Sequence, residues 1–430
     1  AKTKNKTPCF KKRNTYPKQV VKSKADPNMR SLLLFSLLLI SVQSTFAQLV
    51  WQDTPSLDSF PIYDFHPTTD GLLIAMSGGG IQKTTDEGAS WYNIPFVGGL
   101  EGNTFFSDFA QIGNTIYVAA RRRVASQEGG IYKSLDQGET WQASYDENLH
   151  KDVFSLVSVG NRLIAGTRRG IFLSDDGGNS WSRVDEEERE ARRSIPFCMT
   201  TKGNTVVAGT NRSVLLSQDA GDTWQVIEIA DRGDVNRAAF VNNHFYVSTS
   251  GSGIYRSENG SSWEKLDLGL PENQENINAF LMLGQDQYYS SAGNIYKNRK
   301  PINEGFSMDF PSARSFTVYK GSLYAGTYRD GVWKYAIPNN EIANVPKLNL
   351  QPNPSASQAV QLSYEVLEEG SISIVLYDQN GKQLQIIADL QQSVGKYQIE
   401  VDVSQLQNGN YYFHYQNEQY QQTQSLIIAN

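Results

Sequence analysis

The stretch Ser134-Leu135-Asp136-Gln137-Gly138-Glu139-Thr140-Trp141 is one copy of a pattern that recurs along this chain. The pattern, Ser/Thr-x-Asp-x-Gly-x-Ser/Thr-Trp, returns at Thr84–Trp91, Ser174–Trp181 and Ser217–Trp224, and a shortened copy ends at Trp263. Its aspartate can accept backbone N–H groups, its glycine can adopt a positive φ, and its hydroxyls can bond locally. Because short apolar runs flank each copy, the pattern predicts a tight turn between two strands, with the tryptophan packed against a neighbouring unit.

Apolar runs precede every turn and recur about every 40 residues. One apolar residue marks each unit, in the order Ile81, Ile131, Ile171, Val214, Ile254, Ile295 and Val332. Two earlier apolar runs precede each of these, so every unit holds about four short strands. Seven such units predict an all-β chain with a seven-bladed β-propeller. The sixth unit has lost the turn pattern, and Phe306 stands where the tryptophan is expected.

The seventh unit holds only three strands, because no turn pattern follows Val332-Trp333-Lys334-Tyr335. The segment Leu49–Asp53 matches the strands that follow the other turns, and Trp51 stands in the place of the tryptophan that ends the repeated pattern. We therefore expect this segment to supply the missing outer strand, which would remove an exposed sheet edge. The alternative is that Trp51 is an aromatic residue of a linker.

The repeated turn resembles the Asp-box (BNR) repeat, and the resemblance covers residues 49–338. It implies a propeller of the sialidase/sortilin-like superfamily, in which the boxes are structural and do not by themselves imply catalysis. The structural box residues are Asp86, Gly88, Trp91, Asp136, Gly138, Trp141, Asp176, Gly178, Trp181, Asp219, Gly221 and Trp224.

The repeat stops after residue 338, and a linker over residues 339–346 leads to a second domain at 347–430. Six alternating runs predict a small antiparallel β-sandwich: Val360–Tyr364, Ser371–Tyr377, Gln383–Ile387, Tyr397–Val403, Tyr411–Tyr415 and Ser425–Ile428. Pro352-Asn353-Pro354, the Leu376–Lys382 hairpin, the Leu406–Tyr411 segment and the apolar last strand resemble the C-terminal sorting domain of the type IX secretion system of Bacteroidetes. The resemblance implies an export address read by secretion machinery, and an ordinary adhesion-type sandwich is the alternative.

The chain begins with a basic leader over residues 1–28, which has nine Lys and Arg residues against the single acid Asp26. Met29-Arg30, the apolar run Leu32–Val42 and small residues up to Ala47 follow, in the order typical of a secretory signal peptide. We therefore expect residues 1–47 to be leader and signal peptide, and the propeller to occupy residues 48–338. The alternative is a membrane anchor with a basic arm, although the apolar run is short for a bilayer span.

Charge and reactive residues exclude several functions. Loss of residues 1–47 removes ten of the 39 basic residues and one of the 45 acids, which leaves a net charge of about −15 and argues against nucleic acid as a partner. Of the two cysteines only Cys198 would remain, and it is expected in the core. The four histidines have no ligand spacing, so no metal and no cofactor is expected. A monomer is expected, associated with the outer membrane only by surface attachment.

Arginines gather at turns on the propeller face opposite the boxes. The candidate binding residues are Arg193, Arg237, Arg314, Arg168, Arg169, Arg212 and Arg329. The first three precede or begin innermost strands and are expected nearest the central channel, whereas the turn Arg121-Arg122-Arg123 is expected to stay solvated. The acidic run Asp185–Glu190 lies on the same face and can neutralise part of the cluster. The cationic cluster favours an anionic ligand, against the alternative of solvated loop charges.

The sequence thus predicts a secreted or cell-surface binding propeller that recognises a glycan or protein ligand and has no catalytic residues. A sialidase-like or other glycoside hydrolase is the alternative. It would need an Arg-Ile-Pro motif in the first blade, an arginine triad and a Tyr/Glu pair. The first blade has Phe60-Pro61-Ile62-Tyr63, and Arg193-Ser194-Ile195-Pro196 lies in the fourth blade with an extra residue.

Overall fold

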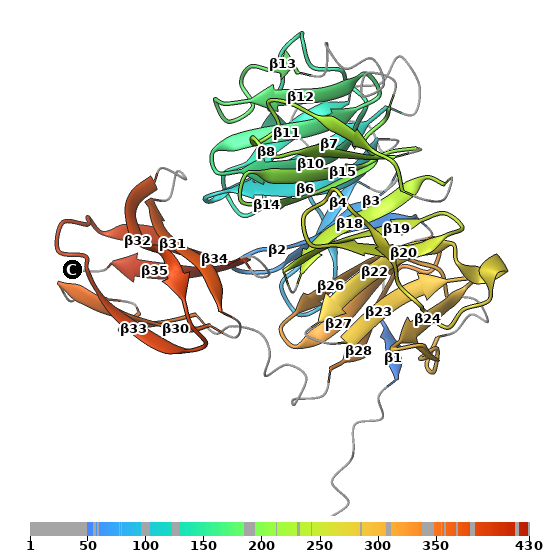
Figure 1. The fold of residues 1–430 in the computed structure, drawn as a ribbon. Helices are drawn as coiled ribbons and strands as arrows, with labels where there is room; N and C mark the ends of the chain where they lie inside the picture. Colours follow the sequence, from blue (N-terminus) through green and yellow to red (C-terminus); the bar gives the residue numbers. More distant parts are fainter. Residues whose placement is uncertain are drawn as a thin grey trace, which may run out of the picture. The chain divides into compact units, whose positions relative to one another are not determined.

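The computed structural model shows an all-β protein, with no α-helix among the residues it describes and one 3-10 turn at Glu272–Gln274. The strands are labelled in Figure 1. The described residues are 50–54, 57, 60–76, 78, 80–95, 104–122, 129–184, 194–211, 213–229, 233–241, 243–283, 286–306, 311–337, 348–353, 355, 356, 358–366, 369–378, 383–417 and 421–428. The predicted leader and signal peptide lie outside them. Within the described part, no helix has the length and apolar character needed to cross a bilayer.

Residues 51–336 form seven four-stranded antiparallel sheets, which we number in chain order. Sheet 1 comprises β2 (Ile62–Pro67), β3 (Leu72–Met76), β4 (Ile81–Thr84) and β5 (Tyr92–Asn93). Sheet 2 comprises β6 (Phe105–Ile112), β7 (Thr115–Arg121), β8 (Gly130–Ser134) and β9 (Gln142–Ala143). Sheet 3 comprises β10 (Val153–Val159), β11 (Arg162–Thr167), β12 (Gly170–Ser174) and β13 (Ser182–Arg183). Sheet 4 comprises β14 (Cys198–Lys202), β15 (Thr205–Gly209), β16 (Val214–Ser217) and β17 (Gln225–Ile227). Sheet 5 comprises β18 (Val235–Val241), β19 (His244–Thr249), β20 (Gly253–Ser257) and β21 (Glu264–Lys265). Sheet 6 comprises β22 (Ile277–Leu283), β23 (Asp286–Ser291), β24 (Asn294–Lys297) and β25 (Lys300–Pro301). Sheet 7 comprises β26 (Ala313–Tyr319), β27 (Ser322–Thr327), β28 (Val332–Ala336) and β1 (Trp51–Asp53).

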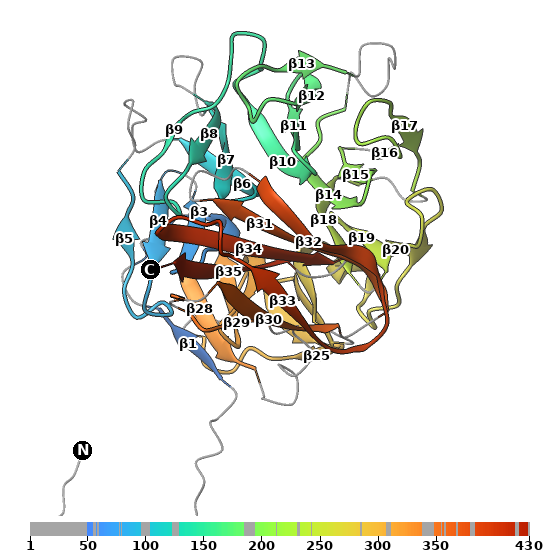
Figure 2. The same ribbon diagram turned by 90° about the vertical axis from the view of Figure 1, so that its left-hand side faces the viewer.

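The seven sheets follow one another around a circle, as Figure 2 shows. The first strand of each sheet contacts the first strand of the next, and β26 of sheet 7 contacts β2 of sheet 1. These first strands therefore surround the axis of the circle, and the short last strands lie farthest from it.

Strand β1 completes sheet 7, as the sequence predicts. Trp51 pairs with Tyr335, and Asp53 pairs with Trp333. The Trp51 indole is buried, and its Nε1 donates to the Ile302 carbonyl of sheet 6 at 2.7 Å. Phe306 packs on the same indole with ring centroids 5.1 Å apart. Trp51 is thus a core residue that also joins sheets 6 and 7, and the linker interpretation is wrong.

The four box turns (Thr84–Trp91, Ser134–Trp141, Ser174–Trp181 and Ser217–Trp224) share one hydrogen-bond pattern. In the second, Asp136 accepts the Ser134 hydroxyl at 2.8 Å and the Thr140 amide at 2.9 Å. Gly138 has φ 89°, and a Cβ there would lie 2.6 Å from the Leu73 side chain of sheet 1. The turn needs glycine both for its positive φ and for this close contact between sheets.

Each box tryptophan helps to fill the space between two sheets. Trp141 is 1% exposed and belongs to a cluster with Leu73 and Ile81 of sheet 1. Its Nε1 donates to the Gly138 carbonyl at 3.0 Å, so burial leaves no unpaired donor. The boxes are therefore structural elements that fix the spacing of neighbouring sheets.

Residues 348–428 form two further sheets that share one hydrophobic core. The strand order of the first is β29 (Asn349–Gln351), β30 (Ala359–Val366), β33 (Gly395–Asp402). The strand order of the second is β32 (Gln383–Gln392), β31 (Gly370–Asp378), β34 (Gly409–Asn417), β35 (Gln421–Ile428). Leu362, Ile374 and Phe413 are fully buried in the shared core. Each of the six predicted strands overlaps one of these seven, and the remaining strand is the short β29. The turn at residues 379–382 lies outside the described residues.

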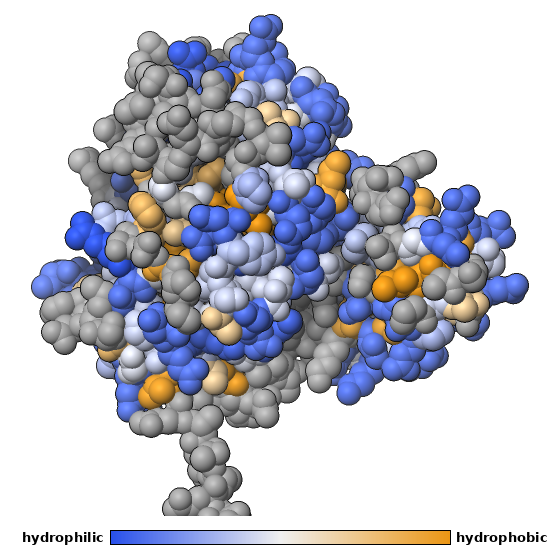
Figure 3. Space-filling model, turned by 180° about the vertical axis from the view of Figure 1, so that it is seen from behind, coloured by the Kyte–Doolittle hydropathy of each residue, from blue (hydrophilic) through white to orange (hydrophobic). Residues whose placement is uncertain are grey.

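The coloured part of the face in Figure 3 is mostly hydrophilic, with hydrophobic areas between. This distribution fits a chain whose apolar side chains are largely used between sheets.

Candidate functional site

A β-bulge near the start of the first strand recurs in six of the seven sheets. The register shifts lie between Ile62/Asp64, Phe106/Asp108, Val153/Ser155, Val235/Arg237, Ile277/Ala279 and Ala313/Ser315. A bulge re-aims the side chain of the extra residue. The six extra residues are Tyr63, Ser107, Phe154, Asn236, Asn278 and Arg314, and all of them line one cavity. The bulges therefore build a common site from separate sheets.

This cavity, the channel cavity, has a volume of about 210 Å³. Arg121, Phe197, Asp234 and Arg237 complete its lining, so six sheets and the residue just before sheet 4, Phe197, contribute to it. Its described lining holds three arginines and one carboxylate, which gives it a positive charge in a chain that is acidic overall. Such a cavity attracts anions.

Arg237 ties three sheets together. Its Nε donates to the Arg314 carbonyl of sheet 7 at 3.2 Å, and its Nη2 donates to the Tyr63 carbonyl of sheet 1 at 2.8 Å. Because Arg237 belongs to sheet 5, its side chain crosses the channel to reach both acceptors. Part of its hydrogen-bonding capacity is therefore used within the fold.

Arg121 and Arg314 have unused donors. The Nε atoms of both are buried and have no hydrogen-bond partner among the described residues. The Arg121 guanidinium lies 4.8 Å from the ring centroid of Phe154, and that of Arg314 lies 4.7 Å from the centroid of Tyr328. These rings hold the guanidinium groups in place while accepting no conventional hydrogen bond. Burial lowers the pKa of Arg121, but arginine remains protonated in proteins.

Two partly buried aspartates lie near Arg237. Asp64 accepts the Phe109 amide of sheet 2 at 3.0 Å, and Asp108 accepts the Leu156 amide of sheet 3 at 2.8 Å. Burial raises the pKa of both carboxyl groups, the negative charge of Asp64 raises that of Asp108 further, and Arg237 opposes both shifts. The pKa of Asp108 is therefore the more strongly raised of the two. Sequence reasoning missed this pair, although an acid inside the apolar run Phe105–Ile112 is a signal that could have found it.

The structure places the predicted arginines differently from one another. Arg237 and Arg314 line the channel cavity. Arg168 pairs with Asp152 at 3.3 Å, and Arg169 is exposed. The guanidinium of Arg329 lies 5.2 Å from the centroid of the Tyr328 ring. Arg193, Arg212, Arg123 and the acidic run Asp185–Glu190 lie outside the described residues. The binding roles of all of them remain predictions.

The expectation that Arg121 is solvated is wrong. It stands opposite Phe105 at the end of β7, on the channel side of the bulge in β6, and its side chain lines the cavity. Arg122 fits the expectation only partly, because its Nε pairs with Asp152 at 3.4 Å.

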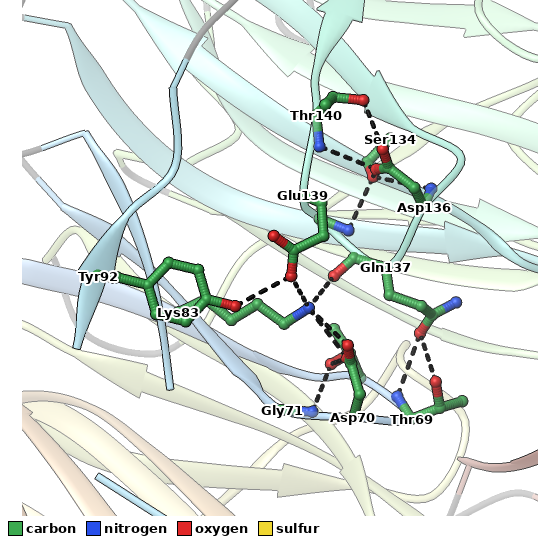
Figure 4. Close-up of polar contacts among 12 residues, drawn as sticks. Thr69, Asp70, Gly71, Lys83, Tyr92, Ser134, Asp136, Gln137, Glu139 and Thr140 are labelled. Carbon is green, nitrogen blue, oxygen red and sulfur yellow. Dashed lines mark hydrogen bonds and ion pairs between the residues drawn. The ribbon is translucent and has the colours of Figure 1, made fainter. Parts of the chain in front are cut away.

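A second charged cluster joins sheets 1 and 2 at a box turn (Figure 4). Lys83 is fully buried, and its ammonium group donates to Asp70 at 3.0 Å, Glu139 at 2.7 Å and the Gln137 carbonyl at 2.9 Å. Tyr92 donates to the same Glu139 oxygen at 2.9 Å, and burial together with this bond raises its pKa to about 12. All three ammonium protons have protein acceptors, so this cluster is a structural tie.

Other chemistry finds no support among the described residues. They contain no group of three or more His, Cys, Asp or Glu residues that could hold a metal ion. Cys198 is buried, and burial raises the pKa of its thiol to about 12, which makes it a poor nucleophile. The described lining of the channel cavity has three arginines and Tyr63 but no glutamate, so the Tyr/Glu pair of the sialidase alternative is not present there.

Several solved structures are similar in fold. YCF48 from Cyanidioschyzon merolae has 14% sequence identity and a TM-score of 0.54 over 68% of this chain and 99% of its own. A structure of YCF48 bound to D1 peptide has 13% identity and a TM-score of 0.52 over 67% and 95%. The extracellular domain of BT4673 from B. thetaiotaomicron has 13% identity and a TM-score of 0.51 over 90% and 59%. At these identities the likeness shows the fold alone, a β-propeller.

Sequence comparison identifies the tail. No curated protein matches the chain. Residues 349–429, however, match the family of secretion system C-terminal sorting domains, as the tail motifs predict. Such a domain interacts with the type IX secretion machinery and directs its protein to the cell surface or the medium. The chain is therefore a β-propeller protein with a type IX sorting domain at its C-terminal end.

Proposed function

We propose that this chain is an exported binding protein that takes an anionic group of a glycan or protein ligand in the channel cavity. In this proposal residues 48–338 are a seven-bladed Asp-box propeller and residues 347–430 a β-sandwich sorting domain. The seven sheets closed by β1 support the blade number, and the core shared by the last two sheets supports the sandwich.

The observation that carries the proposal is the pair of unused donors at Arg121 and Arg314. A buried N–H without an acceptor costs about 1–3 kcal/mol. Two such donors on cations that line the same small cavity are a costly arrangement unless an external acceptor uses them. A carboxylate or sulfate presents oxygens to several donors at once and makes charge-assisted bonds with guanidinium groups.

Binding is favoured over turnover by what surrounds the arginines. A glycosidase of the usual kind needs two carboxyl groups on either side of the bond that it cleaves. The described lining of the cavity offers only Asp234, while Asp64 and Asp108 are bonded to the backbone of neighbouring sheets. Two proteins of similar fold support a binding role. One structure shows YCF48 bound to a peptide, and another is the extracellular domain of the putative hybrid two component system BT4673.

The test compares Arg121→Ala and Arg314→Ala with Arg299→Ala. Arg299 pairs with Asp267 at 3.2 Å and does not line the cavity, so it is the control. The secreted full chain is applied to an array of acidic and neutral glycans. We expect selective binding of acidic glycans that each cavity variant weakens about tenfold or more, as for one lost charge-assisted bond. Equal binding by all three variants would contradict the proposal. Turnover of a fluorogenic sialoside that is abolished by Arg314→Ala would establish the hydrolase alternative instead.

Export through the tail has a separate test. Deletion of residues 347–430 should abolish surface delivery, as measured by fractionation of cells and medium. Unchanged delivery would show that the sorting domain is dispensable.

A further inference from the structure

A second cationic hollow lies on the flank of sheets 2 and 3. This flank groove has a volume of about 740 Å³, and its described lining includes Arg122, Lys151, Arg169 and Arg183 against the single acid Glu147. His150 also lines it, and burial lowers the pKa of that imidazole, so the histidine adds no charge at neutral pH. The groove is large enough for several units of a polymer, whereas the channel cavity is smaller than a usual small-molecule site.

Two adjacent residues of one chain segment line the channel cavity and the groove, one each. Neighbouring side chains at the end of a strand point to opposite sides. Arg121 accordingly lines the channel cavity and Arg122 lines the flank groove. The segment that holds the consecutive arginines is therefore the border that separates the two hollows.

Arg168 bridges this border. Its guanidinium lies 5.7 Å from the Phe154 ring that also faces Arg121, and its Nε pairs with Asp152 at 3.3 Å. The other Asp152 oxygen holds Arg122 at 3.4 Å. Because the Arg168 side chain is 60% exposed, a bound molecule can reach it. Cationic groups thus follow one another from the channel cavity through Arg168 to the groove.

We infer that the flank groove is a second anion subsite of the same binding site and that the ligand is a linear acidic polysaccharide. One anionic sugar occupies the channel cavity while the following units pass Arg168 and enter the groove. This inference rests on the proposed function, because it takes the channel cavity as the first subsite.

The lining of the channel cavity favours a sugar over an acidic peptide. Its described residues are arginines, aromatic residues, small polar side chains such as Asn236 and Asn278, and the single acid Asp234, with no aliphatic side chain among them. Amides and hydroxyls can pair with the hydroxyls of a sugar ring, and aromatic rings can cover its C–H faces. An apolar peptide side chain would find no aliphatic surface here.

The probes are D-galacturonic acid and its linear hexamer, titrated into the full chain by calorimetry. Two linked subsites raise the effective concentration of the second contact, so we expect the hexamer to bind about 100-fold more tightly than the monomer. Arg169→Ala should weaken the hexamer about tenfold and leave the monomer unchanged, whereas Arg121→Ala should weaken both. Arg299→Ala is the control, because Arg299 is an exposed arginine of sheet 6 that pairs with Asp267. The advantage of the hexamer should shrink as salt is raised.

Other outcomes overturn distinct parts of the reasoning. If monomer and hexamer bind equally, Arg169→Ala changes neither, and Arg121→Ala weakens both, the groove subsite is refuted and the proposed function stands. If neither probe binds, the proposed uronate-binding role of the channel cavity fails. If hexaglutamate binds as tightly as the hexamer with the same losses in the variants, the ligand is an acidic peptide and the glycan assignment is wrong.

Discussion

Replacing Lys83 with methionine tests how far the buried charge cluster between sheets 1 and 2 stabilises the propeller. Methionine keeps the apolar stem but removes three hydrogen bonds, to Asp70, Glu139 and the Gln137 carbonyl. Two carboxylates then face each other without their cation. Breaking a buried ion pair by removing one partner costs about 3–5 kcal/mol. Asp70 and Glu139 are 49% and 45% exposed and can regain water, so we expect a loss of about 2–4 kcal/mol.

Lys133 is the matched control, because it occupies the same place before the second box as Lys83 before the first. Its ammonium group donates to the neutral Asn179 of sheet 3 at 3.0 Å in an exposed position. Lys133→Met should therefore cost less than about 0.5 kcal/mol, as surface substitutions usually do. Urea unfolding followed by tryptophan fluorescence measures both variants. The reasoning is refuted if the two differ by less than about 1 kcal/mol.

Three further results are expected. Trp51→Ala should lower the free energy of unfolding by about 3–5 kcal/mol, measured by urea titration, because it empties a buried site and frees the edge of sheet 7; a change below about 1 kcal/mol would contradict the closure. The pKa of Asp108 is raised in the folded state, so the stability that this carboxyl contributes in its protonated form should be lost as pH rises above about 4. Asp108→Asn should flatten that slope in unfolding curves recorded from pH 4 to 8, and an unchanged slope would contradict the raised pKa. The Cys198 thiol should resist an aromatic disulfide reagent at pH 8 until urea unfolds the chain, and rapid labelling of the folded protein would show that it is exposed.

The repeat architecture could be predicted because its signals are local. The box residues specify a turn, the apolar runs alternate around it, and the period fixes where sheets begin. The strand around Trp51 could also be predicted, because its sequence resembles the segments that follow the other box turns. The tail could be predicted from local signals too, since its motifs lie at turns and strand ends.

The channel cavity could not be predicted in detail, because bulges decide which side chains enter it. In a regular strand, Ser107 and Phe109 would share one face, but the extra residue between Phe106 and Asp108 changes that alternation. Nothing in the sequence marks a bulge, so counting along the strand assigns such residues to the wrong side.

The charges of the channel divide into those that hold the sheets together and those that remain for a ligand. Asp64 and Asp108 accept amides of the next sheet, and Arg237 donates to carbonyls of two others, so each of the three satisfies groups that burial would otherwise leave unpaired. Removing Arg237 would therefore lower stability and binding together, and the two effects could not be separated. Arg121 and Arg314 are held by aromatic rings and keep buried donors unused. Ligand affinity should accordingly be tested at these two arginines, although the ranking by sequence position favours Arg193, Arg237 and Arg314 over Arg121.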